Sequence, residues 1–183
     1  MLKIKILLLF IISSLIISII YNHTYEKTVN IVSINSLYER ENYNGYISEL
    51  LRKSKINYNY NIDYTNENME IENLIMKIEN NDNQIQGLLH KSDVIIISIG
   101  NIDYKNEEFK TIIQELEQLF KKIRSINNKQ IYYVSPSIIK NTSYIKEICH
   151  KYNVIYLNGS SFRNKNNLLA QIIFNKIDSM YSR

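Results

Sequence analysis

Residues 92–103 read Ser-Asp-Val-Ile-Ile-Ile-Ser-Ile-Gly-Asn-Ile-Asp, the densest run of β-branched side chains in the chain. An uninterrupted Val/Ile run of this length is typical of a parallel strand that is buried on both faces of a sheet. The run ends at Gly100, and the polar side chains of Asn101 and Asp103 follow at once. In open α/β sheets, functional groups collect just beyond the carboxyl ends of such strands. We therefore expect a site at residues 100–103.

Outward from this strand, segments with strand-like and helix-like apolar spacing alternate along the chain. Short β-branched or alternating segments predict further strands at residues 29–34, 56–62, 130–135 and 153–157. Apolar side chains at helical spacing predict helices at residues 42–53, 69–80, 143–152 and 165–181, and a long helix that begins near Asn106. The first of these helices is expected to turn Tyr46, Ile47, Leu50 and Leu51 inward.

This alternation predicts the fold class, which is α/β. Five strands separated by five helices indicate a three-layer α/β/α domain with a five-stranded, parallel, doubly wound, flavodoxin-like sheet. Residues 92–99 would be its central strand. Residues 56–62 alternate apolar side chains with Asn, so we expect that strand at an edge of the sheet.

The N-terminus carries Lys3 and Lys5 ahead of an uncharged apolar run from Ile6 to Tyr21. This run is close to the length of about 20 residues that a spanning helix needs, and longer than the signal-peptide core of about 7–15 residues. No small-x-small cleavage pattern follows it. Residues 1–24 are thus expected to be an uncleaved signal anchor, a single transmembrane helix, with a cleaved signal peptide as the open alternative.

The two lysines also predict the orientation of the chain. They would stay in the cytoplasm, which places the α/β domain, residues 25–183, on the outer side of the cell membrane in a single-pass protein. Cleavage after the apolar run would instead make the domain a secreted protein.

The composition fits one globular domain with a short appendage, because 45% of the 183 residues are hydrophobic and 22% are charged. The net charge of +4 is dispersed, and no basic stripe with interleaved aromatic residues indicates a nucleic-acid partner. Cys149 is the only cysteine and lies on an apolar helix face, so we expect a buried thiol. The sequence has no Gly-rich phosphate loop and only scattered histidines, and it predicts no metal and no cofactor.

All strands of a parallel sheet end at the same edge, here called the carboxyl edge; the opposite edge is the amino edge. A set of polar residues follows the predicted strands and is expected at the carboxyl edge: Asn35, Ser36, Asn66, Asn68, Asn101, Asp103, Ser135, Ser137, Asn158, Ser160, Ser161 and Arg163.

None of these side chains is an imidazole. A hydrolytic Ser needs a base, nearly always His, within about 3 Å. His90 and His150 close helices that lead into strands, so both are expected at the amino edge, and His23 lies beside the predicted membrane segment. By residue chemistry alone, Ser36, Asn101 and Asp103 are more typical of turn and capping residues than of a catalytic set.

Residues 92–103 resemble the third conserved block of the SGNH/GDSL hydrolases, usually of the form ADLITISIGANDL. Residues 31–37, Ile-Val-Ser-Ile-Asn-Ser-Leu, look like the strand of that family that ends in Gly-Asp-Ser-Leu, and residues 68–81 resemble its second block. Residues 162–168 stand where the family has a His-Pro-Asn-x-x-Gly-Tyr segment. The resemblance spans residues 28–180 and implies the fold of an acyl-ester hydrolase, in a small membrane-tethered bacterial member of the family.

The resemblance also implies roles for individual residues. Ser36 matches the nucleophile, although Asn35 replaces the Asp before it. Phe162 stands at the catalytic His, and Gly159 stands at the Asp that orients that His. Without a base, Ser36 would remain a neutral hydroxyl with no proton acceptor.

The oxyanion donors of the family are altered as well. Asn68 stands at the second-block Gly, and Ile102 stands at the third-block Asn, with Asn101 one residue away. Loss of one oxyanion donor costs about 10²–10³ in rate, and these groups act as a unit, so little triad-type catalysis is expected.

The sequence therefore predicts an SGNH-type domain with a degenerate catalytic set, now a binding or structural module. The expected partners are the membrane, through the N-terminal helix, and an acyl-ester, lipid or cell-wall glycan ligand. Two alternatives remain open. One is an active serine esterase that uses Ser36 with a rearranged base such as Asp103, and the other is an unrelated flavodoxin-like binding module.

Overall fold

The computed structural model describes residues 11–14, 28–35, 43–63, 71–99, 106–135, 142–162 and 165–182. Within these residues, five parallel strands form one sheet in the order β2-β1-β3-β4-β5. The strands are β1 (Val29–Asn35), β2 (Tyr58–Asp63), β3 (Val94–Ser98), β4 (Gln130–Ser135) and β5 (Val154–Asn158). The predicted α/β class and parallel sheet are confirmed, and the strand order is that of the flavodoxin-like doubly wound proteins.

The strand positions within the sheet were also predicted. β3 is the central strand, and its five side chains are all buried, as the unbroken Val/Ile run indicates. β2 lies at an edge. Its alternating Tyr and Asn side chains suit a strand with one wetter side.

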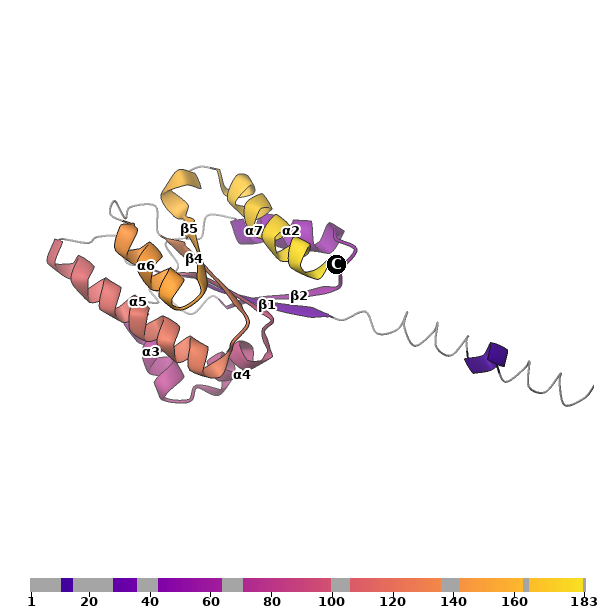
Figure 1. Cartoon of the computed structure of the whole chain (residues 1–183), viewed down its shortest axis with the longest axis horizontal. Helices are drawn as coiled ribbons and strands as arrows, with labels where there is room; N and C mark the ends of the chain where they lie inside the picture. The colour runs from indigo at the N-terminus through magenta and orange to yellow at the C-terminus, as the bar shows by residue number, and fades with distance from the viewer. Residues whose placement is uncertain are drawn as a thin grey trace, which may run out of the picture.

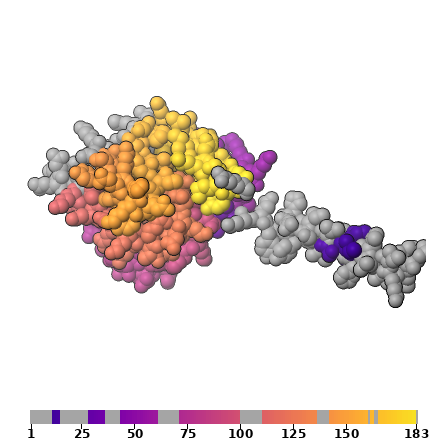
Figure 2. All heavy atoms as spheres, viewed as in Figure 1, coloured from indigo at the N-terminus to yellow at the C-terminus, as the bar shows by residue number. Residues whose placement is uncertain are grey.

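Helices cover both faces of the sheet (Figure 1). On one face lie α2 (Tyr43–Lys53) and α7 (Asn166–Tyr181), and we call this the α2–α7 face. On the other, the α5–α6 face, lie α3 (Ile71–Glu79), α4 (Asn83–Lys91), α5 (Asn106–Ile126) and α6 (Ser143–Lys151). A short 3₁₀ helix, η2 (Gly159–Phe162), joins β5 to α7. In the space-filling view, α5, α6 and α7 form one continuous surface (Figure 2).

Two details differ from the prediction. Between β2 and β3 the chain forms α3 and a second helix, α4, where one helix was predicted. The Asp82 carboxylate caps α4 by accepting hydrogen bonds from the N–H groups of Gln84 and Ile85 at 3.0 and 3.1 Å. In α2, the predicted inward Tyr46 is 45% exposed, because the helix is rotated to bury Tyr43 and Asn44.

The core is divided by the sheet into two apolar clusters, because successive side chains of a strand point to opposite faces. Val94 and Ile96 of β3 face α2 and α7, whereas Ile95 and Ile97 face α3, α5 and α6. Cys149 is 1% exposed, and burial raises the pKa of its thiol to about 12. The predicted buried thiol is confirmed.

Of the predicted membrane anchor, the structure describes residues 11–14, which are helical. Searching the described ranges alone reveals no helix with the length and apolar character that crossing a membrane requires. The other residues of the 1–24 segment lie outside the described ranges, and the anchor stays a prediction.

Candidate functional site at the carboxyl edge

The carboxyl edge brings together the polar residues that end neighbouring strands. Asn35 of β1 is paired in register with Ser98 of β3, and Ser135 of β4 with Asn158 of β5. Asn35, Ser98 and Ser135 are all buried. The predicted position at the carboxyl edge is thus confirmed for Asn35, Ser135 and Asn158. Ser98 was predicted only as part of the strand.

Most of the predicted catalytic positions lie outside the described residues. These are Ser36, Asn68, Asn101, Ile102 and Asp103. The same holds for three other residues predicted at this edge, Asn66, Ser137 and Arg163, and for His23, which was predicted beside the membrane segment. Their roles stay predictions, and the geometry below concerns the residues around them in the sequence.

A buried network of neutral polar groups lies beneath α2, on the α2–α7 face. The Asn35 amide is engaged at both ends: its Oδ1 accepts from the Tyr43 hydroxyl at 2.6 Å, and its Nδ2 donates to Ser33 Oγ at 3.0 Å. Ser33 Oγ donates to Asn44 Oδ1 at 3.0 Å, and the Tyr60 hydroxyl donates to the same oxygen at 2.6 Å. The network ties α2 to β1 and β2. The partners named here, all from the described residues, are amides and hydroxyls, and their hydrogen bonds stabilise the packing of α2 on the sheet.

Sequence reasoning missed this network. The available signal was the pair Tyr43-Asn44 at the start of an otherwise amphipathic helix, because a buried Asn needs partners for its amide. The partners come from two different strands, however, and the register between those strands was needed to find them.

Ser98 behaves differently from its neighbours. It is fully buried, and its hydroxyl has no hydrogen-bond partner within the described part of the chain. Its position after Val94 and Ile96 places it on the α2–α7 face, beside the Asn35 network. A buried hydroxyl without a partner costs stability, so Ser98 is an unfavourable feature among the described residues of the carboxyl edge.

On the α5–α6 face, a second polar contact holds the end of β5 against β4. Ser135 Oγ lies 2.9 Å from the Tyr156 hydroxyl, and the Gly159 N–H donates to Ser135 Oγ at 3.3 Å. A Cβ placed on Gly159 would overlap the Ser135 carbonyl oxygen and lie 3.2 Å from its carbon. A side chain at position 159 would therefore require movement of the Ser135 backbone.

Phe162, which the resemblance aligned with a catalytic His, packs half-buried against the apolar cluster of the α2–α7 face. It ends η2, and its carbonyl accepts from the Lys165 N–H at 2.7 Å at the start of α7. The ring is therefore part of the apolar packing between α7 and the sheet. It offers no proton acceptor.

The described imidazoles lie at the other edge, as predicted. His90 and His150 stand in the last turns of α4 and α6, both exposed, and the strands that follow these helices begin there. Among the described residues, no group of three or more His, Cys, Asp or Glu side chains is placed to hold a metal ion.

The chain shows no match to any family model, curated protein or solved structure with which it was compared.

Proposed function

We propose that this chain is a membrane-tethered, extracytoplasmic domain of the SGNH/GDSL type whose catalytic set is degenerate and which binds its ligand without hydrolysing it. The observation that carries the proposal is the position of the histidines. The chain has three, and the two that the structure describes stand in exposed helix ends at the amino edge. Neither of these two described imidazoles is placed to activate a Ser nucleophile at the carboxyl edge.

Two further observations support the loss of catalysis. Phe162 is engaged in packing at the position of the base, and Gly159 cannot accept a side chain without movement of the Ser135 backbone. Asn35, beside Ser36 in the sequence, has both ends of its amide engaged in the buried network. Phe162 and Gly159, which the resemblance aligns with the base and its orienting acid, are therefore engaged in packing.

The ligand class follows from the ancestry and from the groups that remain. An ester or amide carbonyl accepts hydrogen bonds from hydroxyls, and the exposed Ser161 lies at the carboxyl edge. We propose an acyl-ester-bearing lipid or cell-wall glycan, bound with its carbonyl toward this edge.

The test of lost catalysis is labelling of the full chain with a fluorophosphonate probe, which reacts covalently with activated serines. The wild type and Ser36→Ala are compared, with an authentic serine esterase as the positive control. We expect the same background labelling in both forms of this chain. Labelling that disappears in Ser36→Ala would overturn the proposal and favour an active esterase.

The test of binding is a thermal-unfolding titration with an O-acetylated oligosaccharide and with the same oligosaccharide after deacetylation. A ligand that binds only the folded state raises the midpoint. We expect the acetylated form to raise it more. Equal effects of the two forms, or none, would argue against an acyl-ester ligand.

A further inference from the structure

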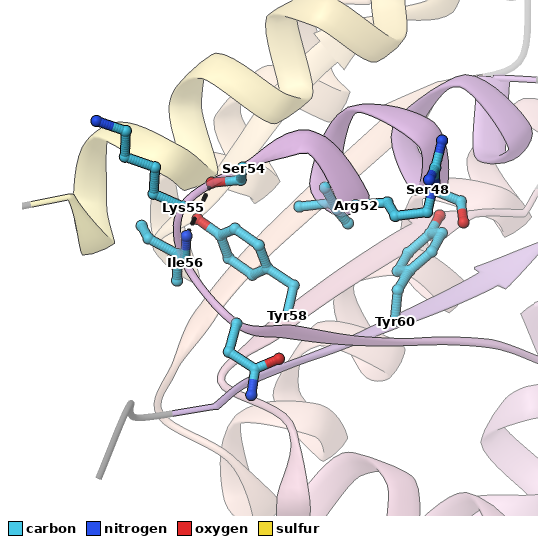
Figure 3. Close-up of a pocket in the computed structure, with 9 residues that line it drawn as sticks. Ser48, Arg52, Ser54, Lys55, Ile56, Tyr58 and Tyr60 are labelled. Carbon is cyan, nitrogen blue, oxygen red and sulfur yellow. Dashed lines mark hydrogen bonds between the residues drawn. The ribbon is translucent and has the colours of Figure 1, made fainter. Parts of the chain in front are cut away.

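A groove of about 490 Å³ lies between the end of α2 and the start of β2, at the amino edge and thus away from the carboxyl-edge site. Figure 3 shows its lining: Ser48 and Arg52 come from α2, Ser54 to Ile56 from the connection, and Tyr58 and Tyr60 from β2. No sequence motif indicated it, because its residues are assembled by the turn between a helix and an edge strand.

Two cations line this groove. Arg52 and Lys55 are both exposed, and neither forms an ion pair with any described carboxylate. Lys53, between them in sequence, is paired with Glu49 at 2.6 Å, and this pair lowers the pKa of Glu49, with a smaller contribution from Arg52. A second acid, Asp178, contacts the groove lining and accepts hydrogen bonds from Ser54 at 2.8 Å and from Tyr58 at 3.2 Å. The groove thus presents two positive charges while its acids are already engaged.

The rings of Tyr58 and Tyr60 form an apolar part of the groove lining. The Tyr58 hydroxyl donates to Asp178 and the Tyr60 hydroxyl donates to Asn44. With their polar ends turned inward, their rings line the groove together with Leu51 and Ile56 (Figure 3). Aromatic rings beside Lys and Arg are the side chains that anchor proteins at the boundary between membrane hydrocarbon and water.

The groove adjoins the point where the N-terminal segment joins the sheet. Asn57 Nδ2 donates to Thr28 Oγ1 at 3.2 Å, and the Asn57 carbonyl accepts from the Val29 N–H at 2.9 Å. Thr28 follows the apolar run that ends at Tyr21 by seven residues, a span of at most about 25 Å when fully extended. A run that enters a membrane would therefore hold this groove close to the lipid headgroups.

We propose that the groove docks the domain on an anionic lipid surface, with Arg52 and Lys55 against headgroup phosphates and the tyrosine rings at the interface. The proposal rests on the membrane tether of the proposed function, concerns the amino edge, and does not depend on whether Ser36 is active. A basic residue near an anionic surface contributes about 1 kcal/mol, so the two cations together are expected to raise the docked-to-undocked ratio about 30-fold. Salt screens this attraction.

The experiment measures hydrogen exchange of the full chain in the presence of vesicles. One set of vesicles contains 30% phosphatidylglycerol in phosphatidylcholine, and the other contains phosphatidylcholine alone. We expect amides of residues 52–60 to exchange more slowly on the anionic vesicles, and added salt to remove the difference. Arg52→Ala/Lys55→Ala should lose the protection. The matched control is Lys110→Ala/Lys165→Ala, which removes two exposed cations near the N-terminal ends of α5 and α7, at the carboxyl edge, and should keep it.

Several results would overturn the proposal. These are equal exchange on the two vesicle types, protection that survives Arg52→Ala/Lys55→Ala, and a chain that floats with neither vesicle. A soluble polyphosphate that protects residues 52–60 as well as the anionic vesicles do, through the same two cations, would assign the groove to a polymer instead of a membrane. Fluorophosphonate labelling at Ser36 would leave all these outcomes unchanged, so a failure of the groove proposal is distinguishable from a failure of the proposal that catalysis is lost.

Discussion

Gly159 and Ser135 approach so closely that a Cβ on Gly159 would overlap the Ser135 carbonyl oxygen. The Gly159 N–H donates to Ser135 Oγ in the same contact, which holds the end of β5 on β4. The position at which the family resemblance expects an acid is therefore one of close backbone packing. Gly159 has no positive φ, so this packing alone requires the glycine.

Gly159→Ala is predicted to lower the free energy of unfolding by about 1–3 kcal/mol, because overpacking forces backbone movement. The matched control is Gly45→Ala in α2, where a Cβ meets no atom within 4 Å. It should raise stability by about 0.4–1 kcal/mol through helix propensity and unfolded-state entropy. Urea unfolding measures both. A Gly159→Ala chain as stable as Gly45→Ala would show that the site can hold a side chain.

Ser98→Ala is predicted to leave stability unchanged or to raise it by up to about 1 kcal/mol, because its buried hydroxyl lacks a partner among the described residues. Ser33→Ala, a buried serine on the adjacent strand, should instead cost about 1–3 kcal/mol, since it leaves the Asn35 amide without an acceptor. Equal losses in the two variants would mean that Ser98 is hydrogen-bonded.

Stability is predicted to fall at alkaline pH through two buried groups. Burial raises the pKa of Cys149 to about 12 and that of Tyr132 to about 12. The unfolded groups ionise near about 8.5 and 10. The folded state thus holds protons that the unfolded state has lost, and stability falls from about pH 8.5 up to pH 12.

Cys149→Ala tests the first part of this window. Urea midpoints are measured across pH. The variant should lose the fall in stability that begins near pH 8.5 and keep the fall that begins near pH 10. The wild-type thiol should also react with a disulfide reagent at pH 8 only as fast as the protein opens, because it is neutral and buried. Rapid reaction under native conditions would show an accessible thiolate.

Phe162→His is predicted to cost about 1–2 kcal/mol, because the half-buried ring packs against the apolar cluster of the α2–α7 face. It should restore no ester hydrolysis, since no acid can stand at Gly159 to orient the new imidazole. Phe162→Leu, the control for packing, should cost less. A Ser36-dependent gain of activity in Phe162→His would show that the base alone is missing.

The fold was largely predictable because each element carries its own periodicity. The unbroken Val/Ile run identified β3 as central, and the Tyr-Asn alternation of β2 identified an edge strand. Helix α4 was missed because it has nine residues, with Gly87 in its middle and an apolar face of only a few side chains. The prediction that Tyr46 is buried was wrong, because helical spacing alone does not show whether Tyr43 or Tyr46 faces the core.

The candidate site was less predictable, since its features depend on contacts between separate elements. The strand ends correctly placed Asn35, Ser135 and Asn158 at one edge, and the helix ends correctly placed His90 and His150 at the other. The Asn35–Ser33–Asn44 network needs the register of β1 with β2 and the rotation of α2. The contact of Gly159 with Ser135 is a close approach of two backbone segments, and no pattern in the sequence predicts it.

The central claim is that the carboxyl edge no longer activates a serine. Its most direct test is the steady-state hydrolysis of p-nitrophenyl acetate and butyrate by the full chain and by Ser36→Ala, from pH 6 to pH 9. The account predicts that the two proteins give the same rate, equal to the background of a catalytically inert protein, at every pH. A kcat/KM that falls at least tenfold in Ser36→Ala would contradict it.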